Sequence, residues 1–206
     1  MSTPSADYRL LAGRSRAELE RILVRGETPS VDSVTGNEYG GWNHPPHMGL
    51  LGIRKFIKGF FRTGDDRHFG YNTPARQDGL DHAWSARPDE DHPKRFGFYR
   101  VAPVDAEGRD NRYLHALLLD YGQGGNTAYD VSRIIRDFLV RVEPGSDELL
   151  LGKAYLALGP ARVFSNFFLL QRLGPVADPP TTPRGEGGNA TASEPGPERP
   201  FVDCSP

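Results

Sequence analysis

The sequence predicts a mainly β protein: a small antiparallel barrel, lipocalin- or calycin-like, of about eight strands behind one N-terminal helix. Aromatic and β-branched runs recur from residue 36 onward between clusters of Gly, Pro, Asp and Asn. Short links join neighbouring runs and so favour antiparallel pairing. Several runs are apolar on both faces, and one helix cannot cover them, so an enclosed interior is expected. A two-layer sandwich is the alternative.

The helix is predicted over 16–25. Ser15 followed by Glu18 is a capping box, in which each residue satisfies a free backbone N–H of the first turn. Gly26 stands where a left-handed residue commonly ends a helix. The apolar residues at helical spacing fall on one face: Leu19, Ile22 and Leu23.

The strands follow in a regular series. The clearest hairpin alternates over 138–143, turns at 144–147 and returns over 148–158. A second hairpin turns through 105–110. The apolar run 48–53 fits a strand, a short helix or a barrel lid equally well. The predicted strands are 36–43, 54–62, 67–73, 94–103, 112–121, 136–143, 148–158 and 163–172.

Three segments make up the predicted domain organisation. Residues 1–13 are expected to be a flexible N-terminus, although Tyr8, Leu10 and Leu11 could dock on the domain. The barrel with its helix occupies 14–173. Residues 174–206 are rich in Pro and Gly with few bulky apolar side chains, so a disordered tail is predicted.

Composition argues against several classes of protein. The net charge of −2 offers no basic surface for nucleic acid. Cys204 is the only cysteine, so neither a disulfide framework nor a multi-cysteine metal site is expected. The chain has no apolar run of the roughly 18 residues that a membrane span needs, and its first residues lack a secretory pattern. A cytoplasmic protein is therefore expected.

The two ends of the β region resemble the bacterial G-x-W-x-G proteins and their companion domain of unknown function. Tyr39 takes the place of the motif's tryptophan, and 64–133 has no counterpart, so the resemblance covers about a third of the chain. It implies a lipocalin-like barrel and carries no activity with it. The matching segments are 38–43 (EYGGWN), 44–47 (HPPH), 54–56 (RKF), 150–153 (LLGK) and 167–172 (FFLLQR).

No cofactor or metal is predicted. His44 and His47 are separated by two prolines and lack a nearby third ligand. The loop 74–93 contains two Asp-His pairs, which are more typical of solvated loop residues than of a catalytic base, and this loop is a candidate lid over the barrel mouth. The Gly-rich stretch 121–126 lacks the spacing of a phosphate loop and is interpreted as a flexible connection.

Polar residues inside otherwise apolar strands are the candidate site. They are expected mainly to pair with each other, as Glu38 with Arg100, and otherwise to meet a ligand. Trp42 is expected to plug the core. The polar and aromatic residues that suggested this candidate site are Glu38, Trp42, Asn43, Lys58, Tyr71, Asn72, Arg100, His115, Asp120 and Asn166. The predicted ligand-binding residues are Trp42, Asn43, Tyr71, Tyr99, Arg100, His115 and Phe167.

Three function hypotheses follow. The first is a binding protein that holds a small apolar or aromatic molecule inside the barrel. The second is a small enzyme of the cyclase or isomerase kind, with His115 and Asp120, or loop histidines, moving a proton in the same cavity. The third is a protein-interaction module that exposes a strand edge or its tail. The sequence leaves open whether the protein is an enzyme and what its oligomeric state is.

Overall fold

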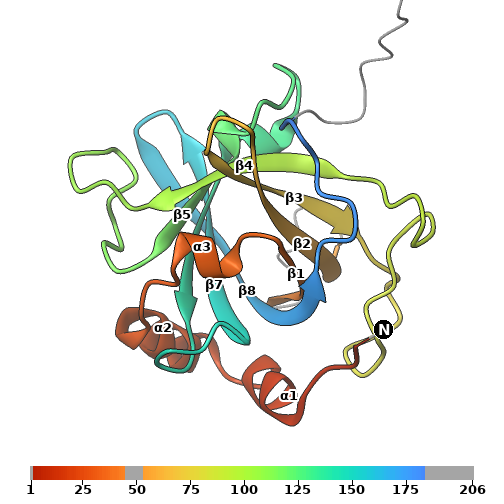
Figure 1. Ribbon diagram of the computed structural model, residues 1–206. Helices are drawn as coiled ribbons and strands as arrows, with labels where there is room; N and C mark the ends of the chain where they lie inside the picture. The colour runs from red at the N-terminus through yellow and green to blue at the C-terminus, as the bar shows by residue number, and fades with distance from the viewer. Residues whose placement is uncertain (1, 45–52, 184–206) are drawn as a thin grey trace, which may run out of the picture.

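The computed structural model describes residues 2–44 and 53–183. These residues form a closed barrel of eight antiparallel strands in sequence order, and β8 pairs back onto β1 (Figure 1). This confirms the predicted barrel and excludes the sandwich. The strands are β1 Asn37–His44, β2 Lys55–Arg62, β3 His68–Pro74, β4 Phe96–Pro103, β5 Leu117–Asp120, β6 Ile135–Arg141, β7 Leu149–Leu158 and β8 Ala161–Pro175.

The described helices are α1 Ala6–Ala12, α2 Arg16–Arg25 and α3 Val31–Val34, with 3₁₀ turns at Tyr121–Gln123 and Val131–Ile134. The bounds of α2 and its capping box are as predicted. The prediction for Gly26 is wrong, because its φ is −66°. A Cβ at Gly26 would lie 2.6 Å from a methyl of Val140 and 2.8 Å from the Arg141 carbonyl oxygen. Close packing on β6, rather than a left-handed backbone, therefore favours glycine here. None of the described helices is long and apolar enough to cross a membrane.

The N-terminal segment, expected to be flexible, instead carries α1 and docks on the barrel. Tyr8 is fully buried, and its hydroxyl donates to the Leu169 carbonyl at 3.3 Å. The backbone N–H of Ser5 donates to Gln171 at 2.7 Å. At the other end, β8 includes residues 174 and 175 of the predicted tail. The predicted tail from residue 184 onward, including Cys204, lies outside the described residues. The expectations for residues 45–52 also lie outside them.

The strand predicted over 112–121 is shorter than expected. Only Leu117–Asp120 pairs with its neighbours, and Pro103 opposite Leu117 is the last residue of the β4–β5 ladder. One further backbone hydrogen bond follows it, from the Val104 N–H to the Ala116 carbonyl at 3.3 Å. The preceding residues form a turn closed by the Ala116 N–H on the Tyr113 carbonyl at 3.1 Å. Tyr113 and His115, which lie within the predicted strand, therefore fall outside β5.

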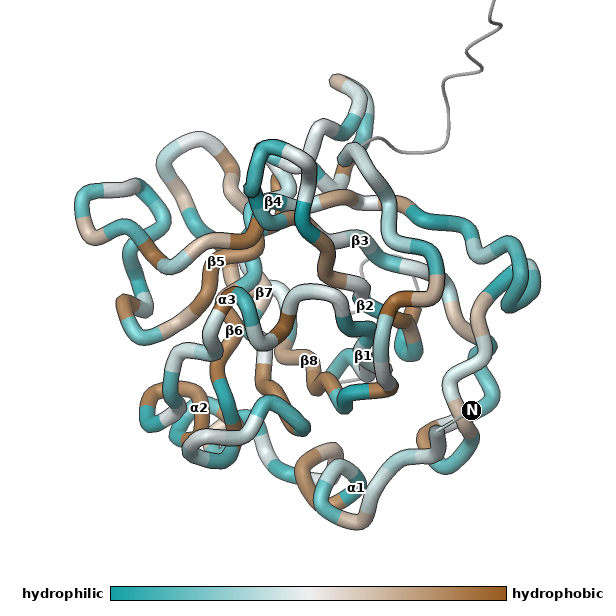
Figure 2. The backbone as a smooth tube through the Cα atoms, viewed as in Figure 1, coloured by the Kyte–Doolittle hydropathy of each residue, from teal (hydrophilic) through white to brown (hydrophobic). Residues whose placement is uncertain are grey.

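Side chains alternate between the interior and the outer face, apart from register shifts in the β1–β8, β3–β4 and β7–β8 ladders. On β2, Phe56, Lys58 and Phe60 face inward, whereas Ile57 and Phe61 pack outside. The outer face is apolar as well because α1, α2 and long loops cover much of it (Figure 1). Hydrophobic residues follow the strands, and the connecting loops are largely hydrophilic (Figure 2). This coverage explains the two-sided apolarity of the strands.

One end of the barrel is filled by side chains. Val34 of α3 packs with Tyr39, Phe60 and Tyr99 in the interior cluster. The Tyr39 and Phe60 rings meet edge-on at 5.5 Å, and Phe60 meets Tyr99 in the same way at 5.8 Å. Free space in the interior is therefore found toward the opposite end.

The β3–β4 connection lies on the outer face, so the described residues do not support its interpretation as a lid. Trp84 is buried, and its indole N–H donates to the Gly41 carbonyl at 3.1 Å. Lys55 anchors the same loop through Asp78 at 2.6 Å and through three loop carbonyls at 2.8–3.2 Å. In Figure 1 the N-terminal segment runs beside this yellow loop.

We expect Gly40→Ala to lower the free energy of unfolding by about 1–3 kcal/mol, because the added methyl displaces the Trp84 ring. A Cβ at Gly40 would lie 2.2 Å from that ring. Urea unfolding measures the change. Gly64→Ala is the matched control, since the space around Gly64 is empty, and its effect should stay within about 0.5 kcal/mol. Equal effects of the two substitutions would contradict the packing argument.

Candidate functional site

The interior holds a cavity of about 180 Å³ at the end of the barrel away from α3. Aliphatic and aromatic side chains form most of its wall, including Phe56, Ile135, Ala154, Leu156 and Phe168. Its polar lining residues come from five strands and the turn region between β5 and β6: Asn43, Lys58, Asn72, Tyr121, Asp130, Ser132, Asp137, Ser165 and Asn166.

Lys58 lies at the centre of a buried polar cluster in this wall. The side chain is 2% exposed, and its ammonium has three acceptors. It donates to Asn72 Oδ1 at 3.1 Å, to Tyr121 Oη at 2.5 Å and to Asp137 Oδ2 at 3.1 Å. All three hydrogens of a charged lysine are thus satisfied.

The partners of Lys58 also bind one another. Tyr121 Oη donates to Asp137 Oδ2 at 3.2 Å and accepts from Asn72 Nδ2 at 3.1 Å. Asn72 donates its other amide hydrogen to the Gly97 carbonyl at 3.0 Å. We name Lys58, Asn72, Tyr121 and Asp137 the lumen cluster. Because each member has at least two partners, the positions of its polar atoms are well defined.

Asp137 is the incompletely satisfied member of the lumen cluster. Its Oδ1 is buried and has no hydrogen-bond partner among the described residues. Burial raises the pKa of Asp137, and the neighbouring Lys58 opposes that rise. Burial likewise lowers the pKa of Lys58, against the attraction of Asp137. Both changes bring the charged pair closer in free energy to a neutral amine beside a neutral acid.

Aromatic rings surround the ammonium. Lys58 Nζ lies 4.5 Å from the centre of the Tyr99 ring, 5.1 Å from Tyr121 and 5.2 Å from Phe168. Ring faces attract a cation, so they offset part of the cost of removing Lys58 from water. The rings also keep the cavity wall apolar up to the lumen cluster.

Amides and a hydroxyl line another part of the cavity. Asn166 donates to Asn43 Oδ1 at 2.8 Å and accepts from Ser165 at 2.9 Å. Asn43 donates in turn to the Ile53 carbonyl at 2.6 Å. Ser132 Oγ is buried without a partner among the described residues. The cavity thus offers two unused polar atoms, Ser132 Oγ and Asp137 Oδ1.

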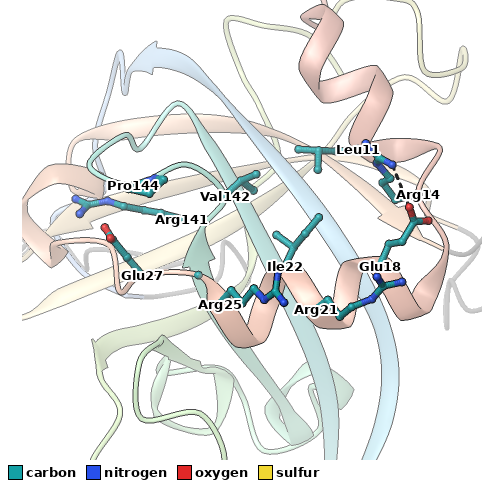
Figure 3. Close-up of a pocket in the computed structure, with 11 residues that line it drawn as sticks. Leu11, Arg14, Glu18, Arg21, Ile22, Arg25, Glu27, Arg141, Val142 and Pro144 are labelled. Carbon is teal, nitrogen blue, oxygen red and sulfur yellow. Dashed lines mark hydrogen bonds and ion pairs between the residues drawn. The ribbon is translucent and has the colours of Figure 1, made fainter.

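A second depression, of about 420 Å³, is an open groove between α2 and the β6–β7 hairpin (Figure 3). Ile22 points from α2 toward Val142 across its floor, and four arginines line it: Arg14, Arg21, Arg25 and Arg141. Arg14 pairs with Glu18 and Arg141 with Asp147. Charges that water reaches are screened and bind weakly, so the cavity inside the barrel, whose lumen cluster is buried, is the better candidate site.

The seven predicted ligand-binding residues lie on both faces of the barrel wall, some toward the interior and some on the outside. Asn43 lines the cavity. Tyr99 faces the interior, and its hydroxyl donates to the Gly59 carbonyl at 3.2 Å. Tyr99 and the other five predicted residues do not line the cavity. Trp42 and Phe167 belong to the outer cluster under α1 and α2, so Trp42 is not the interior plug that the sequence suggested.

The other three predicted ligand-binding residues, Tyr71, Arg100 and His115, form hydrogen bonds outside the cavity. Tyr71 packs in an outer cluster and donates to Glu38 at 2.7 Å, and Arg100 is exposed and donates to Gln123 at 2.8 Å. The predicted pairing of Glu38 with Arg100 is therefore wrong. His115 bonds the Leu23 carbonyl at 3.0 Å. Asp120, which the enzyme hypothesis placed in the cavity with His115, faces outward instead and pairs with Arg136 at 3.1 Å.

Sequence reasoning identified part of the lumen cluster. Its members Lys58 and Asn72 belong to the predicted set of polar residues within apolar strands, as does Asn166 elsewhere in the cavity wall, but Tyr121 and Asp137 were not assigned to a site. One signal could have pointed to Lys58: only four of the 25 basic residues are lysines, and all four lie in predicted strands. Three of them are buried in the structure: Lys55, Lys58 and Lys153.

No three His, Cys, Asp or Glu side chains gather as a metal site within residues 2–44 and 53–183. Comparison of the chain with protein-family models, curated proteins and solved structures found no significant match. The resemblance to the G-x-W-x-G proteins therefore stays a prediction.

Lys58→Met alone should destabilise the barrel by about 3–5 kcal/mol, because it leaves Asp137 buried without its counter-ion. Asp137→Leu alone should have a similar effect. The double variant should be more stable than either single variant, since it removes both buried charges at once. Urea unfolding of all four proteins measures the coupling.

The exposed pair Arg62 and Asp32 serves as the control for this cycle, because its side chains are 45% and 73% exposed. The corresponding changes Arg62→Met and Asp32→Leu should show coupling below about 1 kcal/mol. Additive effects at Lys58 and Asp137 would contradict a direct ion pair between them.

Alkaline pH should unfold the protein cooperatively. Burial raises the pKa of Tyr8, Tyr99 and Tyr121 well above 10. A raised pKa gives stability that is complete below the unfolded value of about 10 and is lost as the pH rises toward the folded values. Tyrosinate absorbance and circular dichroism should therefore change together above about pH 10. Full ionisation of all tyrosines with a native circular dichroism spectrum would contradict this expectation.

Proposed function

We propose that the barrel binds a small, single-ring molecule in the cavity, with the polar group of the ligand against the lumen cluster. The observation that carries this proposal is the unpartnered oxygen of Asp137, which is buried in the wall of an otherwise largely apolar cavity. A buried acceptor without a partner costs about 1–3 kcal/mol, and a ligand that donates to it recovers part of that cost.

The volume limits the size of the ligand. A protein cavity of about 150 Å³ can hold benzene, whereas pockets for drug-sized molecules span about 300–1,000 Å³. The space beside the lumen cluster, about 180 Å³, lies near the lower of these values. A ring with one short substituent is therefore the size class that fits.

The charge balance limits the polarity of the ligand. Lys58 and Asp137 compensate each other, so a charged ligand would bring an uncompensated charge into the apolar interior. A neutral hydroxyl or N–H donor meets Asp137 Oδ1 without that cost. Phenols and small alcohols with an aromatic ring are the chemical class that the cavity favours.

A bacterial origin, a cytoplasmic location and kinship with the G-x-W-x-G proteins belong to the same proposal. The motif segments 38–43 and 150–153 and the near-neutral charge support them. The groove at α2 remains a surface feature without an assigned role.

Phenol should bind with a dissociation constant on the order of 1 mM or below, and more tightly than benzene or benzoate. Calorimetry and chemical-shift changes at cavity residues measure this. Ala154→Leu fills the cavity from β7 and should weaken binding of phenol at least tenfold. Its matched control is Ala157→Leu on the same strand, which does not line the cavity and should bind as wild type does.

Two results would end the proposal. One is the absence of binding by any of the three compounds at concentrations well above 1 mM. The other is equal loss of binding in both alanine variants, because that would place the ligand outside the cavity or show a general loss of structure. Circular dichroism of each variant separates these last two explanations.

A further inference from the structure

Lys58 differs in its surroundings from the two other buried lysines. Lys55 is held by Asp78 and three carbonyls, and Lys153 by both oxygens of Glu20 at 2.6 and 2.8 Å. The carboxylates of Asp78 and Glu20 are 36% and 38% exposed, so water stabilises their charges. Asp137, the partner of Lys58, is 4% exposed. Lys55 and Lys153 thus fasten a loop and a helix, whereas Lys58 faces a cavity.

The geometry allows a proton to pass from Lys58 to its partner. Nζ lies 3.1 Å from Asp137 Oδ2 along a hydrogen bond. Transfer along this bond leaves a neutral amine and a carboxylic acid, and burial favours the neutral state of both groups. The amine, on a side chain that lines the cavity, then carries a lone pair in place of the proton given to Asp137. Asn72 Oδ1 and Tyr121 Oη still accept its two hydrogens, so its position is retained.

We propose that Lys58 is a nucleophile that forms an imine with a small aromatic aldehyde or ketone bound in the cavity, with Asp137 as the acid and base of the step. Desolvation in an apolar pocket activates a lysine amine for this chemistry, and Lys58 is 2% exposed in the wall of a largely apolar cavity. The inference rests on the proposed function, because the carbonyl compound must enter the same cavity.

The step balances without an oxidant or reductant. The lone pair of Nζ forms a bond to the carbonyl carbon, and the electron pair of the C=O bond moves to oxygen. Asp137 gives its proton to that oxygen and takes one from nitrogen, which yields a carbinolamine. Asp137 then protonates the hydroxyl, which leaves as water while the C=N bond forms. The resulting iminium and the Asp137 carboxylate restore the original pair of charges.

With the imine, the lumen cluster would catalyse a reaction of the ligand as well as bind it. A positively charged C=N group withdraws electrons from the neighbouring carbon of the ligand, and this lowers the cost of removing a proton there or of breaking a bond to it. Isomerisation and carbon–carbon bond cleavage of small carbonyl compounds are the reaction classes that such an intermediate supports.

Reductive trapping tests the inference. The folded full-length protein is treated with benzaldehyde and sodium cyanoborohydride, which converts an imine into a stable benzylamine, and peptide mass spectrometry then measures modification of all four lysines. We expect Lys58 to react at least ten times faster than Lys55 or Lys153, which lie buried with fixed partners. Lys94 is exposed and reports the background rate.

Two controls make the result specific. Phenol, which has no carbonyl group, should slow the labelling of Lys58 at least fivefold when it fills the cavity and leave Lys94 unaffected. Asp137→Asn should slow labelling of Lys58 at least tenfold, whereas Asp78→Asn, beside Lys55, should leave the rate at Lys58 unchanged. The phenol control does not depend on whether the Asp137 variant folds.

The outcomes separate this inference from the proposed function. Binding of phenol with no preferential labelling of Lys58 overturns the inference and leaves the binding function standing. Failure of both binding and labelling overturns both. Labelling of Lys58 that phenol does not compete with places the reaction outside the cavity and also overturns the inference.

Discussion

The ion pair between Lys58 and Asp137 is the constraint on which the interior of this protein depends. Closure of the barrel removes inward side chains from bulk water, so a lysine on β2 requires a counter-ion within reach. Asp137 supplies it from β6, a strand that does not pair with β2. Asn72 of β3 and Tyr121 after β5 complete the hydrogen bonds. A single cluster thus links four segments across the lumen and positions the polar wall of the cavity.

A hydrophobic pair of similar volume would fill this part of the barrel at less cost. Buried ion pairs seldom add net stability, because the loss of hydration is about as large as the attraction gained. The closed end of the barrel illustrates the alternative, since Val34, Tyr39 and Phe60 fill it with apolar contacts. The polar cluster beside the cavity therefore calls for an explanation other than stability, and a polar ligand or a reaction provides one.

Local signals predicted the fold well, and the site only in part. The capping box of α2 and the turn at 144–147 are encoded within a few residues, and the segment bounds they imply agree closely with the structure. Strand faces were not predictable, because α1, α2 and the β3–β4 loop make the outer face as apolar as the interior. Trp42 and Phe167 were therefore assigned to the wrong face. Asp137 follows Arg136 in sequence and resembles a surface acid, and only the register across the closed barrel turns it inward.

Side chains fill one end of the barrel, and this explains why only the other end has space for the proposed ligand. Tyr39, Phe60 and Tyr99 meet ring to ring behind α3 and leave the lumen cluster as the inner wall of the remaining space. At the far side of the cavity, Val131 lines the space and is also 66% exposed, so the cavity extends to the molecular surface there. In the proposed function, a ligand would lie between these walls and the Lys58–Asp137 pair, with its ring removed from water, and this environment favours neutral, compact molecules over charged ones.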